Sequence, residues 1–130
     1  MELGLSNKVI VVSGGAKGIG YGITKVLAQE GATVCLVGRS AADNKLAVDA
    51  IAETGGKAFG VVAELTDPND CKKAIDIVLE TFGTIDGLVN NAGVNDGVGL
   101  ENGSYEGFIA SLHKNLVHYY LLAHHALPAL

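Results

Sequence analysis

Two patterns of apolar and polar positions follow one another along the chain. Short, unbroken runs of apolar residues, rich in valine and isoleucine, are typical of strands that are buried on both faces. These runs predict four strands, at residues 8–13, 33–37, 58–63 and 85–90. Apolar residues at helical spacing follow each run and predict helices at residues 18–30, 40–55, 67–83 and 105–127. Strand and helix therefore alternate four times.

Local signals mark where most of these helices begin and end. Ser40 with Asp43 three residues later resembles a capping box, and Asp67 before Pro68 is a strong helix start. Glycines end the earlier helices, and Pro128 ends the last one. The apolar face of the first helix is predicted to consist of Ile19, Ile23, Val26 and Leu27.

Alternation of this kind implies one α/β domain over residues 1–130, a parallel sheet with helices on both faces. Right-handed crossovers favour the strand order 3-2-1-4. The order then reverses between the first and fourth strands, and open sheets of this type bind ligands there, outside the carboxyl ends of the strands. We expect the segments after those two strands to meet at that place.

The turn after the first strand reads Ser13-Gly14-Gly15-Ala16-Lys17-Gly18-Ile19-Gly20. Bare glycines let a backbone come close to a ligand, and the start of a helix offers unpaired N–H groups with a partial positive charge. The turn therefore suits an anion such as a pyrophosphate. The spacing of Gly14, Gly18 and Gly20 is neither the commonest dinucleotide spacing nor that of a P-loop, and many ordinary helices also begin with a glycine-rich turn.

The end of the second strand indicates which dinucleotide would fit. An acid there would bond a ribose 2′-hydroxyl and repel a 2′-phosphate, but the residues are Gly38-Arg39-Ser40. Arg39 pairs with phosphates in a forked geometry, and Lys17 adds a second positive charge. The pattern favours NADP over NAD, with solvated Arg39 and Lys17 side chains as the alternative. Asp43 is interpreted only as an acid in the first turn of a helix.

The segment Asn90-Asn91-Ala92-Gly93 follows the fourth strand. Two amides and two small residues pack poorly in a core, but they suit a place where a flat ligand and a polar network meet the backbone. An ordinary turn is the alternative.

Composition narrows the classes of partner. Apolar residues make up 48% of the chain and charged residues 18%, which is typical of a globular protein. The net charge of −5, without a basic cluster, argues against nucleic acid or an anionic membrane as the main partner. No two histidines are four residues apart, so no metal site is predicted.

Cysteine usage and the N-terminus bear on location. Cys35 and Cys71 are far apart and are interpreted as reduced thiols of a cytosolic protein. The N-terminus has no signal-peptide pattern, and no apolar run reaches about 18 residues. We therefore expect a cytoplasmic chain without a membrane span.

Three motifs together resemble the short-chain dehydrogenase/reductase family: Ser13-Gly14-x-x-x-Gly18-Ile19-Gly20, Asn90-Asn91-Ala92-Gly93 and Asn115 in the last helix. Their order and spacing fit across the whole chain. The resemblance implies a Rossmann-type doubly wound fold and a nicotinamide cofactor, NADP with NAD as the alternative. It also implies hydride transfer to or from a carbonyl or alcohol carbon of a small molecule and, for a full-length relative, a homo-oligomer.

The resemblance implies a role for each residue at a motif position. The phosphates and a nearby ribose would be held by Gly14, Lys17, Gly18, Ile19 and Gly20. The end of the second strand would contribute Arg39 and Ser40. Glu64 and Leu65 would lie beside the adenine, and the nicotinamide-side ribose would be lined by Asn91, Ala92 and Gly93. Asn115 matches the asparagine of the family's catalytic group, which helps to position a water for proton relay.

From Asp86 to Tyr120 the chain is similar in particular to sugar dehydrogenases of the L-fucose dehydrogenase type. A loop with Asn95, Asp96 and Asn102 could bond the hydroxyls of a sugar, and equally it could be a polar surface loop.

The chain departs from the family's pattern in three ways. Ser13 stands where the family usually has Thr, and Glu64 where it usually has Asp. The family's catalytic Ser and Tyr-x-x-x-Lys pair would lie after residue 130, and the Tyr-x-x-x-Lys from Tyr21 to Lys25 falls in the wrong helix. We therefore expect the N-terminal portion of an NADP-preferring enzyme, inactive alone. A non-catalytic dinucleotide-binding module and an unstable fragment are the alternatives.

Overall fold

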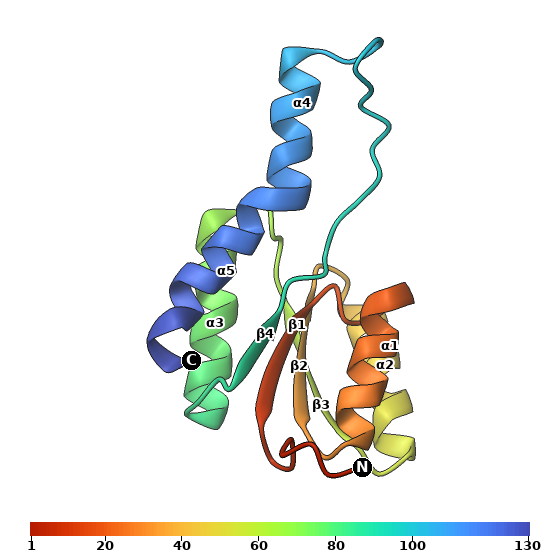
Figure 1. Ribbon diagram of the computed structural model, residues 1–130, viewed down its shortest axis with the longest axis vertical. Helices are drawn as coiled ribbons and strands as arrows, with labels where there is room; N and C mark the ends of the chain where they lie inside the picture. Colours follow the sequence, from red (N-terminus) through yellow and green to blue (C-terminus); the bar gives the residue numbers. More distant parts are fainter.

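The computed structural model describes all 130 residues and contains one parallel sheet of four strands (Figure 1). The strands are β1 (Val9–Ser13), β2 (Thr33–Gly38), β3 (Lys57–Val62) and β4 (Gly87–Val89). Their order in the sheet is β3-β2-β1-β4, with β1 paired in parallel to both β2 and β4. The predicted doubly wound fold and its 3-2-1-4 order are confirmed.

Helices cover both faces of the sheet (Figure 1). The helices are α1 (Gly18–Gln29), α2 (Ala41–Glu53), α3 (Pro68–Phe82), α4 (Tyr105–Leu112) and α5 (His118–Ala126). Successive side chains of β1 point to opposite faces, so Val9 and Val11 pack with residues of α3 and α5, whereas Ile10 and Val12 pack with residues of α1 and α2. The core therefore consists of two apolar clusters, one on each side of β1.

The predicted apolar face of α1 is only partly correct. The side chains of Ile19 and Val26 are 80% and 56% exposed, and the buried residues of the helix are Gly20, Thr24 and Ala28. Small residues are needed here because the helix lies very close to the backbone before it. A Cβ at Gly20 would collide with the carbonyl of Gly14.

The last predicted helix, 105–127, is not one regular α-helix. A π-helical segment, His113–Val117, separates α4 from α5, and a 3₁₀ turn, Leu127–Ala129, follows α5 and contains Pro128. Two carbonyls of the preceding turn accept from side chains: Ser111 from Asn115 at 3.1 Å and Lys114 from the ring nitrogen Nε2 of His118 at 2.8 Å. Side-chain donors of this kind compete with the backbone ladder.

The fourth strand is also shorter than the predicted 85–90, because it joins the ladder only at Gly87 and leaves it after Val89. Beyond that point Asn90 donates its side-chain amide to the carbonyl of Tyr119 at 3.1 Å. The end of β4 is thereby tied to α5 rather than to another strand.

The segment before α5 extends beyond the end of the sheet, where α4 and the loop before it lie apart from the two core clusters (Figure 1). None of the residues of α4 is buried, although Tyr105 and Phe108 are apolar. No helix of the chain combines the length and the hydropathy that crossing a membrane requires.

Candidate functional site

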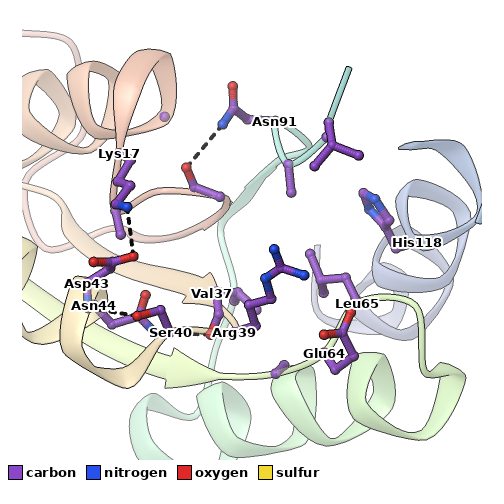
Figure 2. Close-up of a pocket in the computed structure, with 18 of the residues that line it drawn as sticks. Lys17, Val37, Arg39, Ser40, Asp43, Asn44, Glu64, Leu65, Asn91 and His118 are labelled. Atoms are coloured by element: carbon purple, nitrogen blue, oxygen red, sulfur yellow. Dashed lines mark hydrogen bonds and ion pairs between the residues drawn. The ribbon is translucent and has the colours of Figure 1, made fainter. Parts of the chain in front are cut away.

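A cavity of about 840 Å³ lies at the carboxyl end of the sheet, where the order of the strands reverses. Its walls come from the segments that follow all four strands, together with Lys114 and His118. Figure 2 shows these side chains converging from separate elements. Most of the residues predicted for the site line it: Gly14, Lys17, Ile19, Gly20, Arg39, Ser40, Glu64, Leu65, Asn91, Ala92 and Gly93.

Ser13 joins the two segments that the sequence predicted to meet. Its buried hydroxyl oxygen accepts from the backbone N–H of Asn91 at 3.0 Å and from that of Ala92 at 3.1 Å. The side-chain amide of Asn91 in turn donates to the carbonyl of Gly14 at 3.2 Å. Gly14 has φ +67°, and a Cβ there would lie 2.9 Å from the Cα of Ala92. Only glycine fits this contact without strain.

The first turn of α1 opens on the cavity without a cap. Its N-cap residue, Lys17, makes no capping hydrogen bond, and the turn contains no acid. The starts of α2, α3 and α4, by contrast, are capped by the side chains of Ser40, Asp67 and Ser104. The start of α1 therefore keeps unpaired N–H groups and a partial positive charge, which favour an anion.

Two cations and one acid line the cavity near the end of β2. The ammonium of Lys17 lies 3.0 Å from the carboxylate of Asp43, whereas Arg39 makes no ion pair. The hydrogen bond from Lys17 holds the pKa of Asp43 below its ordinary value. The interpretation of Asp43 as merely a first-turn acid was therefore incomplete, because its carboxylate bridges two walls of the cavity (Figure 2).

The segment after β3 is held by the start of α3. The backbone N–H of Glu64 donates to Asp70 at 2.8 Å, and the thiol of Cys71 donates to the carbonyl of Leu65 at 3.4 Å. The carboxylate of Glu64 accepts from the hydroxyl of Thr66 at 2.8 Å. These bonds fix the backbone of Glu64 and Leu65 at the cavity wall.

Two predicted site residues do not line the cavity. Gly18 begins α1 with φ +55°, so its part is in the backbone turn. Asn115 lies in the π-helical segment, where its side-chain oxygen accepts from the N–H of Val94 at 2.6 Å. A Cβ at Gly93 would lie 2.9 Å from that same oxygen. Asn115 thus holds the loop that follows β4.

Sequence reasoning missed two buried polar residues in the wall. Asn44 donates its amide to the carbonyls of Gly38 at 3.1 Å and Val61 at 3.3 Å, and His118 is 1% exposed with its Nδ1 unpaired. A signal existed for both. Each lies at helical spacing with the buried apolar residues of its helix, Ala47 and Ile51 for Asn44, and Leu122 and Ala126 for His118.

Comparison with known proteins decides the family. The model of the short chain dehydrogenase family matches residues 8–130. The chain belongs to the short-chain dehydrogenase family. No group of three or more His, Cys, Asp or Glu side chains in this short-chain dehydrogenase is arranged to hold a metal ion.

The relatives are dehydrogenases and reductases. The chain is 32% identical to a cyclohexanol dehydrogenase from Acinetobacter sp. (strain SE19), over 96% of this chain and 50% of that protein. Two of the solved structures that resemble this chain contain a nicotinamide cofactor. L-sorbose reductase from Gluconobacter frateurii, complexed with NADPH and L-sorbose, has a TM-score of 0.93 and 28% identity, over 99% of this chain and 49% of that one. The NADH-dependent reductase A1-R′, complexed with NAD, has a TM-score of 0.90 and 30% identity, over 98% of this chain and 53% of that one. The chain spans about half the length of these proteins.

Proposed function

We propose that the cavity binds a nicotinamide dinucleotide and that the chain is the cofactor-binding part of an oxidoreductase acting on an alcohol or carbonyl compound. The observation that carries this proposal is the uncapped start of α1, which opens on a cavity at the reversal of the strand order. Helix starts of this kind bind pyrophosphate groups in doubly wound folds. The family supports it, since related structures hold NADPH or NAD.

The residues present fit such a cofactor. Gly20 must lack a side chain, because a Cβ there would lie 2.5 Å from the amide of Asn91 as well as against Gly14. The uncapped start of α1 would hold the pyrophosphate, and Lys17, Arg39 and Ser40 would face the ribose on the adenine side. When bound, the nicotinamide would give or take the hydride.

Further residues would orient the two ends of the dinucleotide. Glu64 and Leu65 would lie beside the adenine, and the backbone from Asn91 to Gly93 beside the nicotinamide-side ribose. Asn115 would be a positioning residue, because it acts through the N–H of Val94. The only Tyr-x-x-x-Lys in the chain, from Tyr21 to Lys25, lies on α1. We therefore propose that residues 1–130 bind the cofactor without turnover.

The finer substrate proposal is a sugar such as L-fucose. It rests on the polar loop after β4, where Asn95 and Asp96 are exposed and Asp96 accepts from the hydroxyl of Ser111 at 3.2 Å. L-sorbose reductase, a structural relative, supports a polyhydroxylated substrate. The resemblance to L-fucose dehydrogenases itself stays a prediction.

The experiment measures binding of NADP⁺ and NAD⁺ to the purified chain by calorimetry and thermal unfolding, with a turnover assay on L-fucose and cyclohexanol. We expect a raised melting temperature with dinucleotide, because a ligand that binds only the folded state stabilises it, and no turnover. Neither nucleotide binding would overturn the proposal. Turnover at rates usual for enzymes would contradict the proposal that residues 1–130 bind the cofactor without turnover.

The variant Ile19→Glu locates the site. Ile19 lines the cavity yet is 80% exposed, so the change places a carboxylate against the pyrophosphate without disturbing the core. We expect dinucleotide affinity to fall by at least about tenfold, while an acid in the first turn leaves the melting temperature of the free chain unchanged or higher. Val26→Glu is the matched control, because Val26 is an exposed residue of α1 outside the cavity. Equal affinities of the two variants would contradict the proposed site.

A further inference from the structure

We propose that Asp43 is a specificity-determining residue, which weakens the preference for a 2′-phosphorylated dinucleotide by engaging Lys17. The inference rests on the proposed dinucleotide site and goes beyond it, because it assigns the choice between NADP and NAD to a residue on α2. It also revises the prediction that the chain prefers NADP, because that prediction treated both Arg39 and Lys17 as free to bind a phosphate.

The ion pair joins two elements that are far apart in the sequence. Lys17 comes from the turn before α1 and Asp43 from the first turn of α2, and their charged atoms are 3.0 Å apart. It is the one ion pair of the cavity wall, and Figure 2 shows it near Ser40, with Arg39 between the pair and Leu65. A 2′-phosphate that reached Lys17 would come close to this carboxylate and be repelled by it.

The carboxylate is less exposed than the ammonium, and it stands on a capped helix turn. The backbone N–H of Asp43 donates to the hydroxyl of Ser40 at 3.1 Å, which fixes the first turn of α2. The Lys17 side chain is 75% exposed, against 33% for that of Asp43. Because the hydrogen bond from Lys17 lowers the pKa of Asp43, the acid stays ionised at neutral pH. A negative charge is therefore a permanent part of this wall.

The two cofactors meet this wall differently. A 2′-phosphate carries a charge near −2, gains from Arg39, and is repelled by Asp43. A free 2′-hydroxyl has no charge to repel and would donate a hydrogen bond to a carboxylate. Arg39 and Asp43 thus act in opposite directions, so the wild-type chain should discriminate only weakly between NADP⁺ and NAD⁺.

The test compares Asp43→Asn with Asp49→Asn. Asp49 lies on the same helix and pairs with Lys45 at 2.8 Å outside the cavity, so the control removes the same charge and one ion pair. Calorimetry at low salt measures the dissociation constants of NADP⁺ and NAD⁺ for wild type and both variants. We expect Asp43→Asn to tighten the binding of NADP⁺ by about five- to tenfold and to change that of NAD⁺ by less than about twofold in either direction. The selective gain should shrink at high salt, and Asp49→Asn should change neither ratio.

The outcomes separate this inference from the proposed function. If both nucleotides bind but the two variants show the same NADP⁺ to NAD⁺ ratio as wild type, the assignment to Asp43 is wrong and the site stands. If Asp49→Asn shifts the ratio as much as Asp43→Asn, the effect is one of net charge and the assignment is again wrong. If no variant binds either nucleotide, both proposals fail. Circular dichroism melting curves of the three proteins check that each is folded.

Discussion

The hydroxyl of Ser13 is the single atom group on which the two walls of the cavity most depend. Its oxygen accepts from two backbone amides, those of Asn91 and Ala92, and the residue is completely buried. The family usually has Thr here, which carries the same hydroxyl. The sequence could identify the position from the resemblance, but the pair of amides that the hydroxyl holds depends on the tertiary structure.

Ser13→Ala should therefore weaken both stability and binding. Two partly buried N–H groups would lose their partner, which costs about 1–3 kcal/mol, and the segment from Asn91 to Gly93 would lose its anchor. Urea unfolding and the dissociation constant of the dinucleotide measure the two effects. Ser13→Thr is the control that keeps the hydroxyl, and we expect it to retain affinity. An alanine variant as stable as wild type would show that the hydroxyl is not the anchor.

At the scale of elements, the π-helical segment His113–Val117 joins a buried helix to an exposed one. The side-chain oxygen of Asn115, in this segment, accepts from the N–H of Val94 at 2.6 Å and so holds the loop after β4. Its side-chain amide donates to the carbonyl of Ser111 at 3.1 Å, one turn earlier. Segments of this kind are frequent at functional sites. The asparagine therefore connects the irregular helix to the wall of the cavity.

Asn115→Ala should release that loop. We expect the amide hydrogen of Val94 to exchange about tenfold faster, because one short hydrogen bond is lost, while amides of β1 keep their protection. Hydrogen exchange followed by NMR measures this. His113→Ala is the control, since His113 is an exposed residue of the same segment. An unchanged exchange rate of the Val94 amide would show that Asn115 does not hold this loop.

Elements with a strong local signal were predicted well, and elements set by contacts were not. The valine-rich runs gave β1 and β2 to within one residue, because buried parallel strands need continuous apolar sequence. Capping residues placed the starts of α2 and α3 correctly. The buried face of α1 and the break before α5 depend on the close approach of Gly20 to Gly14 and on side chains that compete for carbonyls, which hydropathy does not encode.

The residues of the candidate site also differ in whether a local sequence signal or a tertiary contact determines them. The glycine turn and Asn91 to Gly93 were predicted because their residue types are unusual for a core. The bridge from Lys17 to Asp43 joins side chains 26 positions apart, so only the fold brings it into view. The domain boundaries, the cytoplasmic location and the homo-oligomer of a full-length relative stay predictions.

At the scale of the whole molecule, the two cysteines couple the core to pH. Cys35 and Cys71 are both free and completely buried, in the cluster between the sheet and α3. Burial raises the pKa of the Cys35 thiol from 9.0 to about 12, and burial with the nearby charge of Asp70 raises that of Cys71 to about 11. The folded state therefore keeps both protons at a pH where the unfolded chain releases them.

Stability should be unaffected by these thiols below about pH 9 and should fall as the pH rises from there toward 11 to 12, because the unfolded state then binds fewer protons than the folded one. Melting temperatures from pH 7 to 11 measure this decline. In the double variant Cys35→Ala/Cys71→Ala we expect a lower melting temperature at pH 7, from lost packing, but a shallower fall above pH 9. The two proteins differ only at these two positions, so the difference in slope belongs to the thiols. Parallel curves would mean that the buried thiols do not link folding to pH.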